Sequence, residues 1–144
     1  MVTESGTSAG SALPALQRAT HATLRWLSAE LADLDLTPAE INALANLADG
    51  RARTVSRLGA DVGVRPTTLT GVLDRLERRG HLTRSTRSED RRSTLVELTP
   101  SGRRAAEEVR RAMADLERRA LGGLPPEAVT GFHAVLQALT EESS

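Results

Sequence analysis

The sequence predicts a mainly α-helical protein that carries one small β-hairpin, with six helices in a single compact domain. Apolar residues recur at steps of three and four over most of the chain. Short β-rich runs replace this period once, between residues 81 and 99, and capping residues divide the helical segments from one another. A chain of 144 residues can bury roughly 70% of its unfolded surface, which is enough for a core without disulfides.

The first two helices are divided by a capping signal. Residues 1–11 are rich in Ser, Gly, Thr and Ala, and we expect them to be disordered. A leucine-rich helical segment occupies residues 12–36, and its apolar seam needs a partner helix. Thr37 can then cap a second helix over residues 38–49, with Glu40 as the acid of a capping box.

Two short helices follow, and they form a helix–turn–helix pair. Thr54 can cap the third helix, Gly63 ends it, and Pro66 begins a fourth helix that ends at Gly80. Two helices that cross closely need a small residue at the contact, a glycine in the turn and buried aliphatic side chains. The residues that meet these needs are Gly59, Gly63, Val64, Leu69 and Val72.

A hairpin and two further helices complete the chain. Residues 81–86 and 93–99 are short and β-rich, and the loop between them is polar and charged, which favours a wing beside the helix pair. Thr99 can cap a long helix over residues 100–121, and a last helix follows two prolines. Acidic residues flank the arginines of the long helix, so we expect ion pairs along it.

Charge is concentrated in one part of the chain. Residues 51–92 contain eleven arginines and five acidic residues, a balance of +6, whereas the rest of the chain carries −6. A basic surface of this kind attracts phosphate. Only Trp26 and Phe132 are aromatic, which disfavours the stacking surfaces of single-strand binders and favours duplex DNA as the partner.

The composition also bears on localisation and redox regulation. The sequence has no Cys, so we expect no thiol switch. It has no apolar run near the ~20 residues of a membrane span, so we expect a cytoplasmic protein.

The outward face of the fourth helix is the expected DNA-contacting surface, and its N-terminal half should enter the major groove. Asp74 would repel phosphate there, so we expect it to organise Arg75 and Arg78 rather than to contact DNA. In the alternative, the arginines form only surface ion pairs worth about 0.3 kcal/mol each. Contacts to bases and nearby phosphates are expected from Arg65, Thr67, Thr68, Thr70 and Gly71. Contacts to the DNA backbone are expected from Arg53, Arg57, Arg75, Arg78 and Arg87.

Five segments carry a resemblance to a known family. TPAEINAL, TVSRLGADVGV, LTGVLDRLERRG, EDRRS and LTPSG, in this order, resemble the MarR family of winged helix–turn–helix regulators. The resemblance covers nearly the whole chain. It implies an obligate homodimer whose helical dimerisation region comprises residues 12–36 and 100–144, with the winged DNA-binding region at 37–99. It also implies a pseudo-palindromic operator.

The resemblance extends to the tip of the wing, with two departures. It implies that Arg92 enters the minor groove, that Arg91 lies beside it and that Asp90 braces the turn. The wing of the family usually opens with Asp and Pro, whereas Arg87 begins it here and makes the loop more basic. Family recognition helices often begin with a polar cap, whereas Arg65 takes that position here, which weakens capping and adds a cation.

A small-molecule site is a further implication of the resemblance, since many members of the family bind an aromatic or anionic ligand. The candidate residues are His21 and Arg25, which share a helix face, and Trp26, which adds an apolar wall. The simpler and favoured interpretation is a packed Trp beside two surface cations.

These observations favour a homodimeric DNA-binding transcriptional regulator, a repressor rather than an activator, that a small molecule can release. The alternative is a winged-helix protein-interaction module that lacks specific DNA binding. An enzyme is not expected, because the sequence holds no phosphate-binding loop, no metal-binding helix motif and no recognisable arrangement of Ser with His. His21, His81 and His133 stand far apart, so neither a metal site nor a cofactor is expected.

Overall fold

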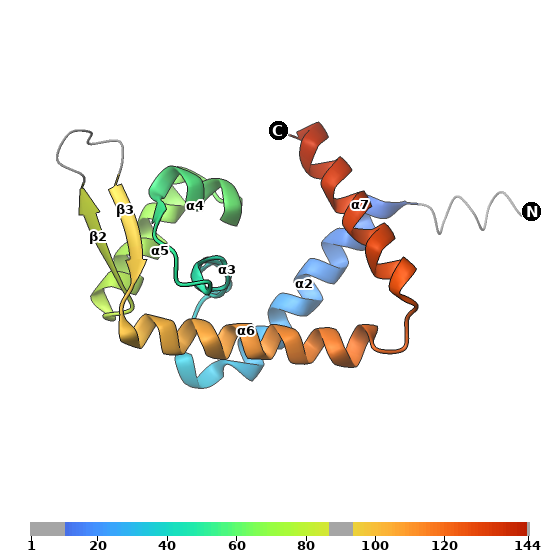
Figure 1. Cartoon of the computed structure of the whole chain (residues 1–144), viewed down its shortest axis with the longest axis horizontal. Coiled ribbons are helices and arrows are strands. Elements are labelled where there is room, and N and C mark those ends of the chain that lie inside the picture. Colours follow the sequence, from blue (N-terminus) through green and yellow to red (C-terminus); the bar gives the residue numbers. More distant parts are fainter. Residues whose placement is uncertain (1–10, 87–93, 144) are drawn as a thin grey trace, which may run out of the picture. The chain divides into compact units, whose positions relative to one another are not determined.

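The computed structural model describes residues 11–86 and 94–143, and within them lie six α-helices, one 3₁₀ helix and one antiparallel sheet (Figure 1). The predicted class, mainly α with a small β wing, is confirmed. All but the last residue of the N-terminal tail that we expected to be disordered lies outside the described residues. The helices are α2 (Ala12–Glu30), η1 (Ala32–Leu34), α3 (Pro38–Leu47), α4 (Val55–Val62), α5 (Pro66–Arg78), α6 (Pro100–Leu121) and α7 (Pro126–Ser143). The strands are β1 (Arg53–Thr54), β2 (Leu82–Thr86) and β3 (Thr94–Leu98).

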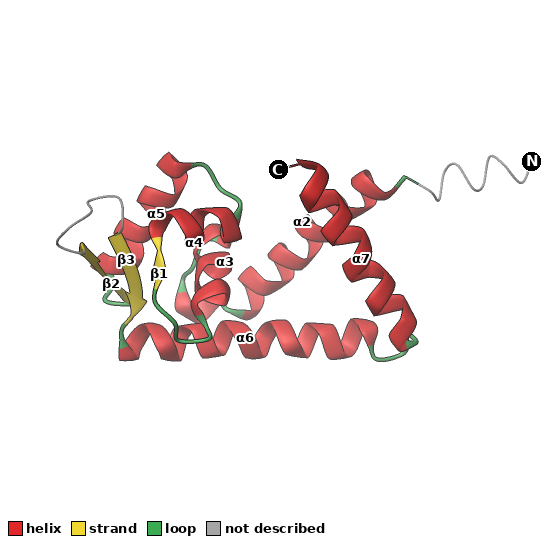
Figure 2. Ribbon diagram, turned by 45° about the horizontal axis from the view of Figure 1, so that its top comes forward, coloured by secondary structure: helices red, strands yellow, loops and turns green. Residues whose placement is uncertain are grey.

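The sheet has one more strand than the sequence predicts. Its order is β1-β3-β2, and both pairings are antiparallel (Figure 2). Val96 of the central strand β3 lies opposite Arg53 of β1 on one side and opposite Arg84 of β2 on the other. The expected hairpin is confirmed as β2 and β3. A two-residue strand such as β1 leaves no alternation to detect, and it exists because β3 offers it a free edge.

The capping signals of the sequence are present in the structure. The backbone N–H of Glu40 donates to Thr37 Oγ1 at 3.2 Å, and the N–H of Thr37 donates to Glu40 Oε1 at 2.9 Å, which completes the predicted capping box. Thr54 accepts from the N–H of Arg57 at 3.1 Å and so caps α4. Gly63 then ends α4 at a φ of 75°, a left-handed conformation that favours glycine.

The chain divides into two compact units, residues up to Ala112 and residues from Met113 onward. The first unit holds an aliphatic core that ties α3, α4, α5 and the sheet together. In the second unit, every residue of α7 is at least partly exposed in the single chain. The largest fully buried aliphatic side chains of the core are Ile41, Leu44, Leu47, Leu58, Leu73, Leu76, Leu82, Val96 and Val109.

The end of the hairpin and the start of α6 meet at a tight junction. The N–H of Thr99 donates to the carbonyl of His81 at 3.0 Å, and Thr99 Oγ1 accepts from the N–H of Gly102 at 3.0 Å. Gly102 is buried, and a Cβ built on it would lie 1.8 Å from the same His81 carbonyl oxygen. His81 Nδ1 lies 3.1 Å from Ser101 Oγ, and burial lowers the pKa of the His81 imidazole.

Candidate nucleic-acid interface

Helix α5 has one buried face and one exposed face, as its helical period predicts. Leu69, Val72, Leu73 and Leu76 are buried and hold the helix against the rest of the unit. The exposed residues of the other face include Thr67, Thr68, Thr70, Gly71 and Arg78. Contact of these residues with DNA stays a prediction, but the structure makes all of them accessible.

The N-terminus of α5 is positively polarised. Arg65 holds the cap position in an extended conformation, and its side chain makes no capping hydrogen bond within the described chain. Pro66 follows at the first helical position. The first-turn N–H groups of Thr67 and Thr68 therefore receive no cap from Arg65, and a helix end of this kind favours an anion.

Arg75 and Arg79 turn from α5 toward a buried carboxylate. Glu40 is fully buried, and its Oε2 lies 2.9 Å from Arg75 Nε in an ion pair that lacks the alignment of a hydrogen bond. Arg79 Nη1 lies 3.9 Å from Glu40 Oε1 and donates to the carbonyl of Asp35 at 2.7 Å. The Arg75 guanidinium, which we expected on the DNA backbone, thus serves first to fasten α5 to α3.

The expected pairing of Asp74 is corrected by the structure. Asp74 pairs with Arg84 of β2, whose Nη2 lies 2.6 Å from Asp74 Oδ1, rather than with Arg75 or Arg78. Arg84 also binds Glu77, with Nη2 2.6 Å and Nε 3.1 Å from Oε1. Hydrogen bonds to Glu77 and Asp74 raise the pKa of the Arg84 guanidinium. The reason for the correction is spatial: β2 returns alongside α5 and brings a cation that sequence spacing along the helix does not reveal.

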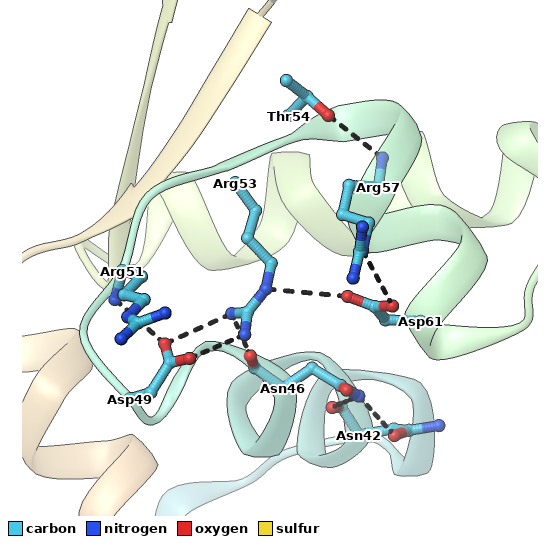
Figure 3. A network of polar contacts seen from close by, with 8 residues as sticks. All are labelled: Asn42, Asn46, Asp49, Arg51, Arg53, Thr54, Arg57 and Asp61. Carbon is cyan, nitrogen blue, oxygen red and sulfur yellow. Dashed lines mark hydrogen bonds and ion pairs between the residues drawn. The ribbon is translucent and has the colours of Figure 1, made fainter.

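Arg53 is the centre of a polar network around the start of α4 (Figure 3). Its Nη2 lies 2.8 Å from Asp49 Oδ2, its Nε lies 3.6 Å from Asp61 Oδ2, and it donates to the carbonyl of Asn46. The N–H of Arg51 donates to Asp49 Oδ1 at 2.9 Å and lowers the pKa of that carboxyl. These partners commit the Arg53 guanidinium to local structure, and its contact with DNA stays a prediction.

The other backbone candidates differ in how much of the side chain is accessible. Arg57 pairs with Asp61 at 3.4 Å, yet 73% of its side chain is exposed. Arg78 is also exposed. The wing-tip candidates, Arg87, Asp90, Arg91 and Arg92, lie outside the described residues.

The predicted small-molecule residues lie on α2. His21 and Arg25 are exposed, and Trp26 is half-buried. One groove that the structure describes lies elsewhere, between α4 and the first turns of α5. Its residues were not singled out together by the sequence, because the lining comes from two helices and the turn between them.

Two searches of the described residues gave negative results. No group of His, Asp or Glu side chains among them could hold a metal ion. No helix among them is long and apolar enough to cross a membrane.

Together, the helix pair, the hairpin and the exposed face of α5 define a winged helix–turn–helix protein. Residues 36–94 match the MarR family. The chain is 35% identical over 71 residues to the uncharacterized HTH-type transcriptional regulator YfiV of Bacillus subtilis, a match that covers 49% of this chain and 44% of YfiV. The matched segments span about half the length of the curated relatives.

Solved structures extend the likeness to most of the chain. A MarR-family regulator from Silicibacter pomeroyi is 29% identical, with a TM-score of 0.73 over 88% of this chain and 86% of that one. A mutant of MarR from E. coli, complexed with operator DNA, is 26% identical, with a TM-score of 0.72 over 90% and 94%. BpsR of Bordetella bronchiseptica, whose DNA binding is regulated by 6-hydroxynicotinic acid, is 27% identical, with a TM-score of 0.71 over 89% and 98%. Residues 36–94 thus carry the match to the MarR family, and over most of its length the chain has the fold of solved MarR-family transcriptional regulators.

Proposed function

We propose that the protein represses transcription by binding, as a homodimer, a pseudo-palindromic site in promoter DNA. The observation that carries this proposal is the exposed first turn of α5, which contains Arg65, Thr67 and Thr68. The side chain of Arg65 does not cap the N-terminus of this helix. A buried aliphatic stripe fixes this turn on the body of the unit. A rigid, positively polarised helix end suits the major groove of duplex DNA.

The accessible residues among the predicted contacts have a place in this proposal, whereas Arg53 and Arg75 are engaged by acidic side chains of the chain itself. Arg65, Thr67, Thr68, Thr70 and Gly71 lie where α5 faces the bases, whereas Arg57 and Arg78 approach the phosphates. Arg84 supports the arrangement, because its single positive charge offsets part of the negative charge of Asp74 and Glu77 and so reduces their repulsion of phosphate. The minor-groove contacts that the resemblance implies for Arg91 and Arg92, and the brace that it implies for Asp90, remain part of the proposal, as does the backbone contact predicted for Arg87; these residues lie outside the described ones. The operator complex of E. coli MarR supports DNA as the partner.

A second copy of the chain completes the molecule in this proposal. Apolar side chains of the predicted dimerisation region remain exposed in the single chain, including Leu13 at 54%, Leu124 at 50%, Phe132 at 50% and Val135 at 46%. Exposed apolar residues of this size favour a partner surface. Association of two copies buries them and presents two copies of α5 to one duplex.

A small aromatic or anionic molecule releases the protein from DNA in this proposal. His21 and Arg25 lie four residues apart on α2, so their two donors lie on one face and suit a carboxylate. Trp26 adds apolar surface beside them. The regulation of BpsR by 6-hydroxynicotinic acid supports this class of ligand.

The test is binding of the purified protein to a duplex of its own upstream region and to a scrambled duplex, across a salt series. We expect the native duplex to bind at least about a hundredfold tighter, in line with specific recognition, and affinity to fall with salt at a slope of about −0.9 per phosphate contact. Binding to neither duplex at low salt would contradict the proposal and favour the protein-interaction module.

A pair of variants separates the exposed turn of α5 from general charge. Arg65→Ala removes a cation from that turn, and we expect specific binding to weaken by about 1–3 kcal/mol, the scale of one good base contact. Arg111→Ala removes the same charge from α6, where 73% of the Arg111 side chain is exposed beside Glu107, and it serves as the matched control. Equal losses in the two variants would mean that only net charge matters.

A further inference from the structure

A groove of about 460 Å³ lies between α4 and the N-terminal half of α5, and none of the predicted contacts uses it as a whole. We call it the α4–α5 groove. Ser56, Ala60, Pro66 and Thr70 form its exposed rim. Its eight lining residues are Val55, Ser56, Gly59, Ala60, Val64, Pro66, Leu69 and Thr70.

The lining of the α4–α5 groove is mainly apolar. The Thr70 hydroxyl adds little polarity to it, because its hydrogen is already used in a hydrogen bond. Thr70 Oγ1 donates its hydrogen to the carbonyl of Pro66 at 3.0 Å, so this hydroxyl is no longer a free donor. The hydroxyl oxygen can still accept a hydrogen bond, and the methyl group is the apolar part of the Thr70 side chain that a partner can contact. At Gly59 the two helices are in close contact, because a Cβ there would lie 3.2 Å from Leu69 Cδ2. The groove is thus closed at its base by the helix crossing.

The charge around the α4–α5 groove favours a polyanion as the occupant. All eight lining residues are uncharged. Arg57 follows Ser56 in α4, pairs with Asp61 at 3.4 Å and keeps 73% of its side chain exposed, and the exposed Arg65 precedes Pro66 without a capping bond. An apolar cleft flanked by two cations suits a duplex edge, since cations can hold the phosphates while an apolar group of a base enters the cleft.

Position and chemistry together identify that group. Thr70 belongs both to the groove and to the face of α5 that is turned toward DNA under the proposed function, on which this inference rests, and the exposed Pro66 lies one helical turn before it. The base edges in the major groove carry one apolar substituent, the 5-methyl group of thymine, and side-chain methyl groups are its usual partners. We infer that the α4–α5 groove binds a thymine 5-methyl group and that the Thr70 methyl is a specificity-determining contact.

The test removes single methyl groups from each side of the contact. Duplexes that the full-length protein selects from a random pool are resynthesised with one thymine at a time replaced by deoxyuridine, which lacks only the 5-methyl group. In the wild-type protein we expect one thymine per half-site at which this replacement weakens binding about fourfold, the value of one buried methyl group. The scan on the wild-type protein needs no variant.

Two variants then assign the contact to Thr70. Thr70→Ser removes the methyl group and keeps the hydroxyl, whereas Thr70→Val keeps a methyl group at the same place and removes the hydroxyl. We expect Thr70→Ser to bind the thymine duplex about fourfold more weakly and to lose its response to deoxyuridine, because the two groups act as a pair. Thr70→Val should respond as the wild type does.

The outcomes distinguish a failure of this inference from a failure of the proposed DNA-binding function. A wild-type protein that tolerates deoxyuridine at every position, or a Thr70→Ser variant with the full wild-type response, would overturn the inference and leave DNA binding intact. Failure to select any duplex would overturn the proposed function and the inference together. Thermal unfolding of both variants verifies that the exposed substitution leaves the fold unchanged.

Discussion

At some positions the structure allows only one residue type for a reason that the sequence does not reveal, and Gly102 is the clearest example. In the sequence it belongs to the segment LTPSG, which contributes to the family resemblance without a physical reason. In the structure it lets α6 begin against the His81 carbonyl, since a Cβ would lie 1.8 Å from that oxygen and 2.7 Å from its carbon. Both atoms belong to the backbone, so a side-chain rotation cannot relieve the clash.

Gly102→Ala should therefore destabilise the protein, although alanine is the better helix former. We expect the free energy of unfolding to fall by about 1–3 kcal/mol, the usual cost of overpacking, as measured by urea unfolding. Gly131→Ala in α7 is the matched control, because no described atom lies within 4 Å of a Cβ built there. That variant should gain up to about 1 kcal/mol from helix propensity. A stabilised Gly102→Ala protein would refute the contact.

At the scale of elements, α5 is held in place by ion pairs on two sides. Glu40 of α3 engages Arg75 and Arg79, and Arg84 of β2 engages Asp74 and Glu77. Local signals predicted the bounds and caps of these elements, because the Thr37 capping box and the Thr54 cap depend on residues three positions apart. The same signals could not show which helix would approach Glu40 or which strand would bring Arg84, since these contacts span many residues. Strand β1 and the α4–α5 groove escaped prediction for the same reason.

The fastening of α5 to α3 can be tested at Glu40. Glu40→Gln keeps an acceptor for the N–H of Thr37 but removes the charge that faces Arg75. We expect the free energy of unfolding to fall by about 1–2 kcal/mol, less than the roughly 3–5 kcal/mol lost when a fully buried ion pair is broken, because Arg75 is half-exposed and can be rehydrated. Glu117→Gln, an exposed position of α6, should change stability by less than about 0.5 kcal/mol. Equal stability of the two variants would show that the buried charge contributes nothing.

At the scale of the whole molecule, the question is what covers the apolar side chains that the single chain leaves exposed. Under the proposed function a pseudo-palindromic operator requires two copies of α5, so dimerisation and DNA binding should fail together. Phe132, half of whose surface is exposed in α7, is the most informative position, since burying an aromatic side chain contributes more than burying any other apolar residue nearby. The mass of the chain, 15.4 kDa, makes one and two copies easy to distinguish by light scattering.

Phe132→Glu should convert the protein from two copies to one, because dimerisation would then bury an unpaired carboxylate. The variant should also bind the palindromic duplex at least about a hundredfold more weakly, since each half-site is then bound without the effective concentration that a linked second site supplies. Thr130→Glu introduces the same charge at another exposed position of α7 and is expected to stay dimeric. If Phe132→Glu remains a dimer, the exposed aromatic lies outside the interface. If it becomes a monomer with undiminished affinity, one copy of α5 is sufficient for binding and the two-fold model of recognition is wrong.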